Sequence, residues 1–377
     1  MTKPLVSICI PTFNRANHIT DALNYAIQQT YSNVEILVVD NCSTDSTMQI
    51  CQQFKQKDSR ISIYQNDTNI GACANLNRCV ELAKGEYIKF LLSDDIILPT
   101  CVERMMEIFE KFPTVKLVAC REDRIDNVGT VVSKDLPPIE TGLISGRKTI
   151  KDNLYSNGFF SNFIATPSGV LIKTIDFASG FDPSMHWALD LELWLRILLL
   201  GGDYYRIDEP LALARDHKGS STTVVEDTLV YIIHDILRLR NQFADFMAEE
   251  GVSAEEWTAY IDKLILDYLS NRLQTLSPEV VSASTNKFIS MVGHNKTEEM
   301  VNAMLTVIFY LSTVLTKPVS ELNYQKAQAA RYKAEAIWYK DEAEKLAQTI
   351  NSMTASLPWK IAKPLRTLKA KLAGLTK

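Results

Sequence analysis

Two adjacent carboxylates, Asp94 and Asp95, directly follow Ser93 and the apolar run Tyr87–Leu92. At the end of a strand they would repel each other and would need a compensating positive charge. A bound Mg²⁺ or Mn²⁺ would supply it, because hard cations take few carboxylates together with phosphate oxygens. The pair therefore predicts a divalent-metal site that also holds a diphosphate. The alternative interpretation is a capped turn before Pro99.

Polar residues also follow the earlier apolar runs. They are Pro11-Thr-Phe-Asn-Arg15 after Leu5–Ile10, Asp40-Asn-Cys-Ser-Thr-Asp45 after Val34–Val39, and Asn69-Ile-Gly71 with Asn75 after Ile61–Tyr64. An aspartate at a strand end can accept a hydrogen bond from a nucleobase or a ribose, or it can cap a helix. No G-x-x-x-x-G-K-[ST] or G-x-G-x-x-G motif occurs, which argues against a P-loop NTPase or a dinucleotide enzyme.

The elements that would position these residues alternate along the first 120 positions. Apolar β-branched runs, ending with Val115–Cys120, are separated by amphipathic segments near 19–29, 44–55, 72–84 and 99–112. This alternation predicts βαβ units and a mostly parallel sheet, with ligands bound beyond the carboxyl ends of the strands. From 121 to 180 the pattern loosens into short strands and turns. A helix over Ala188–Leu200 and a strand over Tyr204–Ile207 follow.

Taken together, the motifs resemble glycosyltransferase family 2. The resemblance rests on Val6–Arg15, Val38–Asp45, Asn69–Gly71, Ala83–Tyr87 and Leu92–Asp95, and it continues through Gly180–Asp182, Asp190–Arg196 and Arg215–His217. It covers about residues 4–222 and implies a Rossmann-like GT-A domain over 1–225. It also implies an enzyme that transfers a sugar, with inversion, from a UDP-, GDP- or dTDP-sugar.

The resemblance assigns roles to individual residues. Pro11, Thr12, Asn14 and Arg15 would border the nucleotide, Asp40 would bind its base, and Asn69, Gly71 and Asn75 would line the nucleoside pocket. Ser93 and Asp94 would contact the donor, Asp94 and Asp95 would hold the metal, and Arg215 and His217 would contact the diphosphate, with His217 also a metal ligand. Asp190 would be the catalytic base. Many members carry an acid where this chain has Leu92, which bears on metal dependence.

Asp190 lies at the start of the helix expected over Ala188–Leu200. Free backbone N–H groups and the helix dipole would favour its ionised form there, which a base requires. Glu192 is a competing base, but it lies two positions along, about 200° around the helix. The two carboxylates therefore cannot face the same hydroxyl.

The C-terminal third predicts three further parts. Residues 226–316 form a helical domain, in which Ser253-Ala-Glu-Glu256 is a capping box. Residues 317–357 carry a heptad pattern that predicts a coiled coil and a homo-oligomer, with a single amphipathic helix as the alternative. Residues 358–377 hold six Lys or Arg and no acid. This tail resembles those of bacterial glycosyltransferases that build surface glycans, and it predicts binding to an anionic membrane. Packing of the tail on the acidic body is the alternative.

Composition narrows the function classes. The net charge of −5 argues against a nucleic-acid partner. The seven cysteines contain no C-x-x-C pair, so reduced thiols are expected rather than disulfides or a zinc site. No run reaches the ~18 apolar residues of a membrane span and no signal peptide is recognised, so a cytoplasmic protein, peripheral on the inner face of the cell membrane, is expected.

The sequence thus predicts a metal-assisted glycosyltransferase that acts on a glycan acceptor, lipid-linked in this interpretation. The rival from another class is a catalytically silent scaffold that binds nucleotide-sugar, which Leu92 favours. A nucleotidyltransferase is disfavoured, because Pro11–Arg15 is not the Gly-rich basic loop that such an enzyme would need.

Overall fold

The computed structural model describes residues 3–133, 140–155, 162, 164–177, 180–216 and 229–275. The chain divides into two compact units, Met1–Val224 and Val225–Lys377. His217, the heptad region 317–357, the tail 358–377 and the helical region beyond 275 lie outside the described residues.

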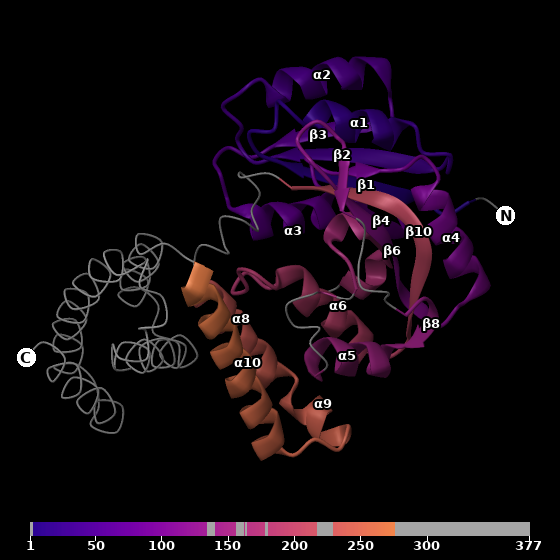
Figure 1. Ribbon diagram of the computed structural model, residues 1–377. Coiled ribbons are helices and arrows are strands. Elements are labelled where there is room, and N and C mark those ends of the chain that lie inside the picture. Colours follow the sequence, from indigo (N-terminus) through magenta and orange to yellow (C-terminus); the bar gives the residue numbers. More distant parts are fainter. Residues whose placement is uncertain are drawn as a thin grey trace, which may run out of the picture. The chain divides into compact units, whose positions relative to one another are not determined.

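The first unit is built on a mixed sheet (Figure 1), whose strand order is β3-β2-β1-β4-β9-β6-β10-β5. Its strands are β1 (Val6–Thr12), β2 (Val34–Asp40), β3 (Ile61–Gln65), β4 (Tyr87–Phe90), β5 (Ile96–Ile97), β6 (Val115–Ile125), β7 (Val131–Ser133), β8 (Gly142–Ser145), β9 (Val170–Lys173) and β10 (Asp203–Arg215). β7 pairs with β6, and β8 pairs with β10.

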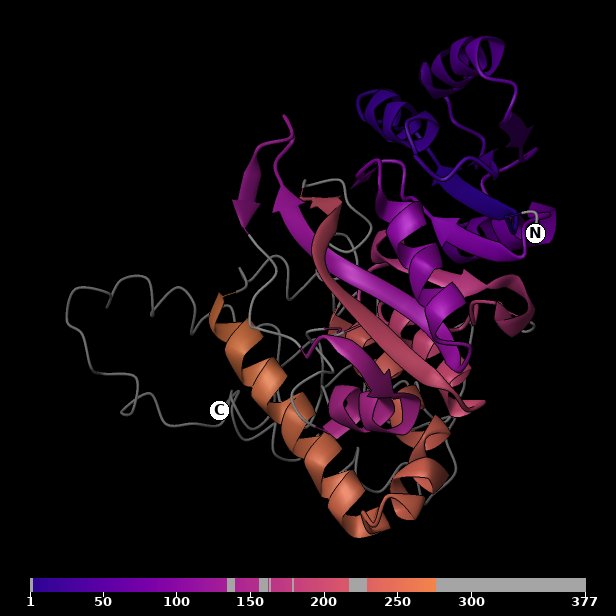
Figure 2. The ribbon, with the colours of Figure 1, turned by 90° about the vertical axis from the view of Figure 1, so that its right-hand side faces the viewer.

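The longer ladders are parallel. β3, β2, β1 and β4 pair in parallel, as do β6 and β10, which Figure 2 shows side by side. β9 inserts antiparallel between β4 and β6. The α/β fold with a mostly parallel sheet is therefore confirmed. The antiparallel β9 lies within residues 121–180, for which the sequence predicted only short strands and turns.

Helices cover both faces of this sheet (Figure 1). They are α1 (Ile19–Ile27), α2 (Thr47–Lys57), α3 (Ala72–Leu82), α4 (Cys101–Lys111), α5 (Gly146–Tyr155) and α6 (Leu189–Leu199), with 3-10 turns at η2 (Pro167–Gly169) and η3 (Thr174–Phe177). Alternate β1 residues Val6, Ile8 and Ile10 join α1, α2 and α4 in one core. The opposite face of β1 meets α3, where Cys9 Sγ lies 3.8 Å from the Cys79 carbonyl oxygen.

The described part of the second unit is helical. It contains α8 (Leu229–Gln242), α9 (Ala244–Glu249) and α10 (Ala254–Thr275). The predicted capping box is confirmed, because Glu256 N donates to Ser253 Oγ at 3.2 Å and Ser253 N donates to Glu256 Oε2 at 3.0 Å. Trp257 Nε1 donates to the Arg240 carbonyl at 2.9 Å and ties α10 to α8. Among the described residues, no helix has the length and apolar character to cross a membrane.

Candidate active site

Asp95 is a buried anchor just beyond the carboxyl end of β4. Ser168 Oγ donates to its Oδ2 at 2.6 Å, and the backbone N–H of Arg215 donates to its Oδ1 at 2.9 Å. Only 5% of Asp95 is exposed, and burial together with the charge of Asp94 raises the pKa of its carboxyl to about 8. Three distant parts of the chain therefore meet at this carboxyl group.

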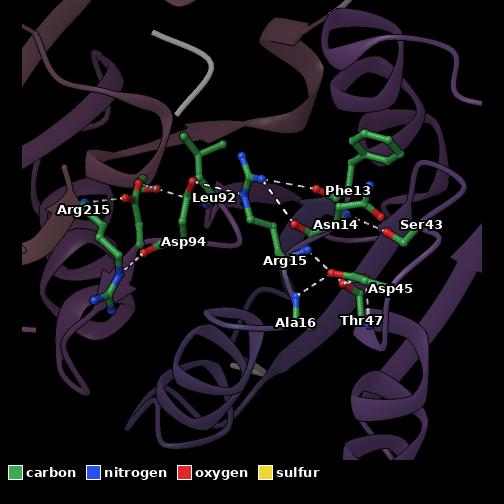
Figure 3. Close-up of polar contacts among 12 residues, drawn as sticks. Phe13, Asn14, Arg15, Ala16, Ser43, Asp45, Thr47, Leu92, Asp94 and Arg215 are labelled. Atoms are coloured by element: carbon green, nitrogen blue, oxygen red, sulfur yellow. Dashed lines mark hydrogen bonds and ion pairs between the residues drawn. The ribbon is translucent and has the colours of Figure 1, made fainter. Parts of the chain in front are cut away.

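Asp94 faces the loop that follows β1. Its Oδ2 lies 3.3 Å from Arg15 Nε, with the two side chains 14% and 21% exposed. Figure 3 shows the Arg15 side chain reaching from this loop to Asp94. The fold thus brings together two motifs that lie about 80 positions apart, the expected nucleotide loop and the expected metal motif.

The acidic pair fits a divalent cation. Both groups offer hard oxygen ligands, which Mg²⁺ and Mn²⁺ prefer. The raised pKa of Asp95 is partly caused by the neighbouring Asp94 charge, a repulsion that a bound cation would relieve. Asp94 already accepts one cation, Arg15, so its carboxylate is accessible to positive charge.

Arg215 is expected at the diphosphate, and the structure shows its guanidinium engaged with loops. Its side chain is 1% exposed and pairs with Asp21 Oδ2 at 3.1 Å. It also donates to the carbonyl oxygens of Asp94, Asp126 and Asn127 at 2.8 to 3.0 Å. These contacts give Arg215 a clear structural role in fixing the acidic motif. A contact with the diphosphate stays a prediction.

The loops after β1 and β2 are cross-linked. Asn14 Oδ1 accepts from Thr44 N at 2.8 Å, and Asn14 N donates to Ser43 Oγ at 2.8 Å. Asn14 has a φ of 51°, a left-handed conformation that asparagine tolerates better than most residues. Pro11 and Thr12 complete β1 beside this loop. The expected nucleotide-bordering residues therefore form one connected edge.

Asp40 is fully buried at the end of β2. Its Oδ2 accepts from Ser43 N at 2.9 Å and from Gln65 Nε2 at 3.0 Å, and Ser43 Oγ donates to Oδ1. The contacts hold the loop after β2, and they differ from the helix cap that the sequence allowed as the alternative to base binding, because α2 begins at Thr47 with Ser46 as its N-cap residue. They fix the carboxylate at the strand end, and binding of a nucleobase by Asp40 stays a prediction.

Asparagine side chains organise the next loop. Asn75 Nδ2 donates to the Val39 carbonyl at 3.0 Å, and Asn66 Nδ2 donates to Asn75 Oδ1 at 2.8 Å and to Asn41 Oδ1 at 3.0 Å. Asn69 Oδ1 accepts from Asn41 Nδ2 at 2.9 Å.

This network was only partly found from the sequence. Gly71 has a φ of 87° and follows Asn69 at the start of α3, where both were expected. Asn41 and Asn66 were missed. The only signal for Asn41 was its place directly after a strand-ending aspartate.

Asp190 lies in the first turn of α6. Its Oδ2 accepts from Asn162 Nδ2 at 3.2 Å and its Oδ1 from Leu191 N at 2.8 Å. Burial raises the pKa of the carboxyl to about 6, against the lowering effect of the Leu191 N–H. From the sequence only the helix N-terminus was visible, and it favours the ionised form of the carboxyl. In the structure, burial raises the pKa of Asp190 by more than the helix N-terminus lowers it, and the resulting pKa suits a base that works near neutral pH.

Glu192 faces a different partner. It is buried, and Arg196 Nε lies 2.8 Å from its Oε1. Arg196 Nη2 also donates to the Gly180 carbonyl at 2.6 Å. Glu192 therefore stabilises α6 and the turn beside it, as the 200° separation from Asp190 suggested.

Comparison with known proteins bears on the class of this site. Residues 7–168 match the sequence model of the family described as glycosyl transferase family 2. These residues belong to glycosyltransferase family 2. The protein is thus an enzyme of the glycosyltransferase class, and the relatives described next carry names of the same class.

Two relatives come from Bacillus subtilis strain 168. TuaG, named as a teichuronic acid biosynthesis glycosyltransferase, is 28% identical over 214 residues, which span 56% of this chain and 78% of TuaG. EpsE, named as a glycosyltransferase, is 25% identical over 250 residues, which span 65% of this chain and 86% of EpsE.

A solved structure confirms the fold. The crystal structure of S. aureus TarS residues 1–349 in complex with UDP-GlcNAc superposes on this chain with a TM-score of 0.55 at 19% sequence identity. The superposition covers 90% of this chain and 91% of the TarS chain. The α/β fold with its mixed sheet matches the expected GT-A type.

Proposed function

We propose that this protein transfers a sugar from a nucleotide-sugar to a lipid-linked bacterial surface glycan, in one inverting displacement. The observation that carries the proposal is the half-buried Asp190 carboxyl, whose pKa of about 6 is linked through Asn162 and the backbone around Ala165 to the segment that binds Asp95. A base and an acidic donor-binding motif are thereby held in one connected framework.

Asp190 acts as the general base. At neutral pH most of this carboxyl is ionised, so it takes the proton of the acceptor hydroxyl as that oxygen attacks the anomeric carbon. The hydrogen bond from Asn162 holds Oδ2, and the Leu191 N–H holds Oδ1. Attack from the side opposite the leaving diphosphate inverts the anomeric centre.

Positive charge stabilises the leaving diphosphate, on the side of the anomeric carbon opposite to Asp190. Arg15 lies in the loop after β1, 3.3 Å from Asp94, and its guanidinium would contact the phosphate oxygens. Asp94 and Asp95, with His217 beyond the described residues, would hold Mg²⁺ or Mn²⁺. Such a cation would neutralise the charge that develops on the diphosphate.

The donor lies along the strand ends. Pro11, Thr12 and Asn14 border the nucleotide, Asp40 takes its base, and the loop Asn69–Gly71 with Asn75 closes the nucleoside pocket, as the family resemblance implies. Ser93 lies beside the acidic pair. The TarS complex holds UDP-GlcNAc, which makes UDP-sugars the first donors to try, before GDP- and dTDP-sugars.

The acceptor is a membrane-linked glycan in this proposal. TuaG is named for teichuronic acid biosynthesis, a surface glycan, and the basic residues 358–377 suit an anionic leaflet. The enzyme then lies on the inner face of the cell membrane as a homo-oligomer that forms through 317–357. Its lipid-linked acceptor would be presented there.

Leu92 favours one alternative, a silent scaffold that binds nucleotide-sugar. Leu92 replaces the acid that many family members carry, and its N–H donates to Ser168 Oγ at 3.0 Å. The backbone at this position is fixed by a hydroxyl, and the apolar side chain offers no metal or ribose ligand.

A donor screen separates the two functions. UDP-, GDP- and dTDP-sugars are added to the full-length protein with and without Mn²⁺, and both thermal stabilisation and release of nucleoside diphosphate are measured. We expect one donor class to stabilise the protein and to be hydrolysed. Stabilisation without release would support the scaffold, and no effect of any donor would overturn both.

A further inference from the structure

Lys89 is a fully buried lysine at the centre of the sheet. It lies on β4, is 0% exposed, and donates from Nζ to the Ser168 carbonyl and, at 3.3 Å, to the Val170 carbonyl. A buried ammonium costs several kcal/mol unless hydrogen bonds and an opposite charge offset its desolvation. This cost indicates that the hydrogen bonds of Lys89 have a role that an apolar side chain at the same position could not fill.

Glu122 on β6 supplies negative charge to the same region. Its Oε2 accepts from Thr166 N at 2.8 Å and its Oε1 from Thr166 Oγ1 at 2.5 Å. A Cβ added to Gly169 would lie 2.7 Å from Glu122 Cδ, so the carboxyl group packs directly on this backbone. Lys89 and Glu122 therefore both form hydrogen bonds with one stretch of chain, residues 164–170, which we call the connecting segment.

The connecting segment contacts both groups assigned to the chemistry. At one end, Ser168 Oγ donates to Asp95 at 2.6 Å and accepts from Leu92 N at 3.0 Å. At the other end, the Ala165 carbonyl accepts from Trp194 Nε1 at 3.2 Å and from Asn162 Nδ2 at 3.1 Å. Trp194 lies on α6, the helix that carries Asp190.

We propose that Lys89 and Glu122 are positioning residues for sugar transfer, because together they set where the connecting segment holds Asp95 and the Asp190 helix. The proposal rests on the roles given above to the acidic pair and to Asp190. Neither residue is placed in contact with substrate, and they act through Ser168 and Ala165. An apolar pair of the same volume could give a core of similar stability, but it could not fix two backbone carbonyls and a threonine.

The same geometry explains how the motif tolerates Leu92. The Ser168 hydroxyl bridges Leu92 N and Asp95 Oδ2, so the turn of the acidic motif is held through its backbone. The position that carries an acid in many family members is then supported from the connecting segment.

Substitutions that remove or weaken these hydrogen bonds test the proposal. Lys89→Met keeps side-chain length without charge, and Glu122→Gln keeps an acceptor for Thr166. Lys89→Met alone removes one of the two positive charges, with Arg124, that favour the ionised form of Glu122, and it risks misfolding. The main variant is therefore the double Lys89→Met/Glu122→Gln. Glu122→Gln alone serves if the double does not fold. Lys116→Met is the matched control, because Lys116 is a partly exposed lysine on β6 that pairs with Asp176 at 2.8 Å.

The first readout is amide hydrogen exchange of the full chain, which needs no ligand. We expect exchange in residues 164–170 and 92–95 to be at least tenfold faster in the double variant than in the wild type. Residues 6–40 should be unchanged, and the Lys116→Met control should match the wild type. Equal exchange in the wild type and the double variant at both segments would overturn the proposal.

The second readout is binding of Mn²⁺ alone, measured from the resonance signal of the free ion. Outer partners of metal ligands typically change affinity by 10–100-fold, so we expect weakening of about tenfold in the double variant and in Ser168→Ala. Because both act through one contact, combining them should add little. Full additivity would mean that Lys89 and Glu122 do not act through Ser168. If the wild type binds no Mn²⁺, the metal part of the proposed function fails, and hydrogen exchange still decides the positioning role.

Discussion

At the scale of single residues, the environment of Asp190 makes it a suitable base and Glu192 an unsuitable one. Within the described part of the chain, Asp190 accepts from two neutral donors, Asn162 Nδ2 and the Leu191 N–H, and it pairs with no cation. Glu192 is buried against the guanidinium of Arg196 at 2.8 Å. Arg196 Nε donates to Glu192 Oε1 at 2.8 Å and Arg196 Nη2 donates to Oε2 at 3.0 Å, so both carboxylate oxygens are already engaged within α6.

The pH dependence of turnover should report on Asp190. Its pKa of about 6 means that the carboxyl becomes protonated as the pH falls through 6, and a protonated carboxyl cannot take the acceptor proton. We expect kcat to be level above pH 7 and to fall about tenfold per unit well below pH 6. The pH–rate profile, with donor saturating, measures this limb. A limb near pH 4 would indicate a carboxyl with an ordinary pKa instead.

Asp190 should also cost the enzyme stability. Its folded-state pKa of about 6 lies above the ~3.9 of an unfolded aspartate, so the native state binds more protons between these values. Stability contributed by this group is then present at low pH and is lost as the pH rises from about 4 to 6.

Asp190→Asn removes that penalty. At pH 7.5 the variant should be more stable than the wild type by about 1–3 kcal/mol, and at pH 4 the difference should vanish. Urea unfolding at the two pH values measures it. A variant that is less stable than the wild type at pH 7.5 would show that the native site favours the ionised carboxyl.

At the scale of elements, asparagine side chains connect the loop after β3 with the start of α3. Asn75→Ala removes the donor to the Val39 carbonyl and an acceptor of Asn66. Leaving such buried groups unsatisfied costs about 1–3 kcal/mol. We expect a lower thermal midpoint and weaker donor binding, measured by the shift that the nucleotide-sugar produces.

Asn77→Ala is the matched control on the same helix. Asn77 bonds with the backbone of Phe181, through Nδ2 at 3.0 Å and Oδ1 at 2.7 Å, so its removal also costs stability. It does not touch the loop Asn69–Gly71 in these contacts. If both variants weaken donor binding equally, the asparagine network has no specific role at the nucleoside.

The elements differ in how far they follow from the sequence. The parallel strands β1 to β4 and helices α1 to α4 are read from apolar runs and amphipathic periods, which are local signals. β9 is four residues long and is flanked by 3-10 turns, so no period marks it. Its place between β4 and β6 is set by tertiary pairing.

The site shows the same division. Asp94 and Asp95 follow an apolar run, which is a local signal, whereas Asp190 was assigned from the resemblance to the family. The contacts of Asp95 with Ser168 and Arg215 span 73 and 120 positions, and no residue close to Asp95 in the sequence indicates them. The raised pKa of Asp190 likewise comes from burial by the tertiary fold, which outweighs the helix N-terminus that the sequence made visible.

At the scale of the whole molecule, charge separates the body from the tail. The tail 358–377 carries six basic residues in a chain of net charge −5. If it binds an anionic leaflet, each basic residue near the surface contributes about 1 kcal/mol, and salt weakens the binding.

Truncation after Leu357 tests this arrangement. We expect the full chain to float with phosphatidylserine-containing liposomes at low salt and the truncated chain to stay in solution, while both hydrolyse donor at similar rates. Neutral liposomes are the control and should retain neither protein. Equal flotation of the two proteins would refute membrane binding by the tail, and a full-length monomer by light scattering would refute assembly through 317–357.

The central claim is that Asp190 drives turnover of a nucleotide-sugar at this site. The direct measurement is release of nucleoside diphosphate by full-length wild type and by Asp190→Asn, with the donor that stabilises both proteins and with Mn²⁺ present. We predict equal thermal stabilisation by that donor and a release rate at least ~10²-fold lower in the variant. Near-normal release by Asp190→Asn, alongside an inactive but folded Glu192→Gln, would contradict the claim and move the base to Glu192.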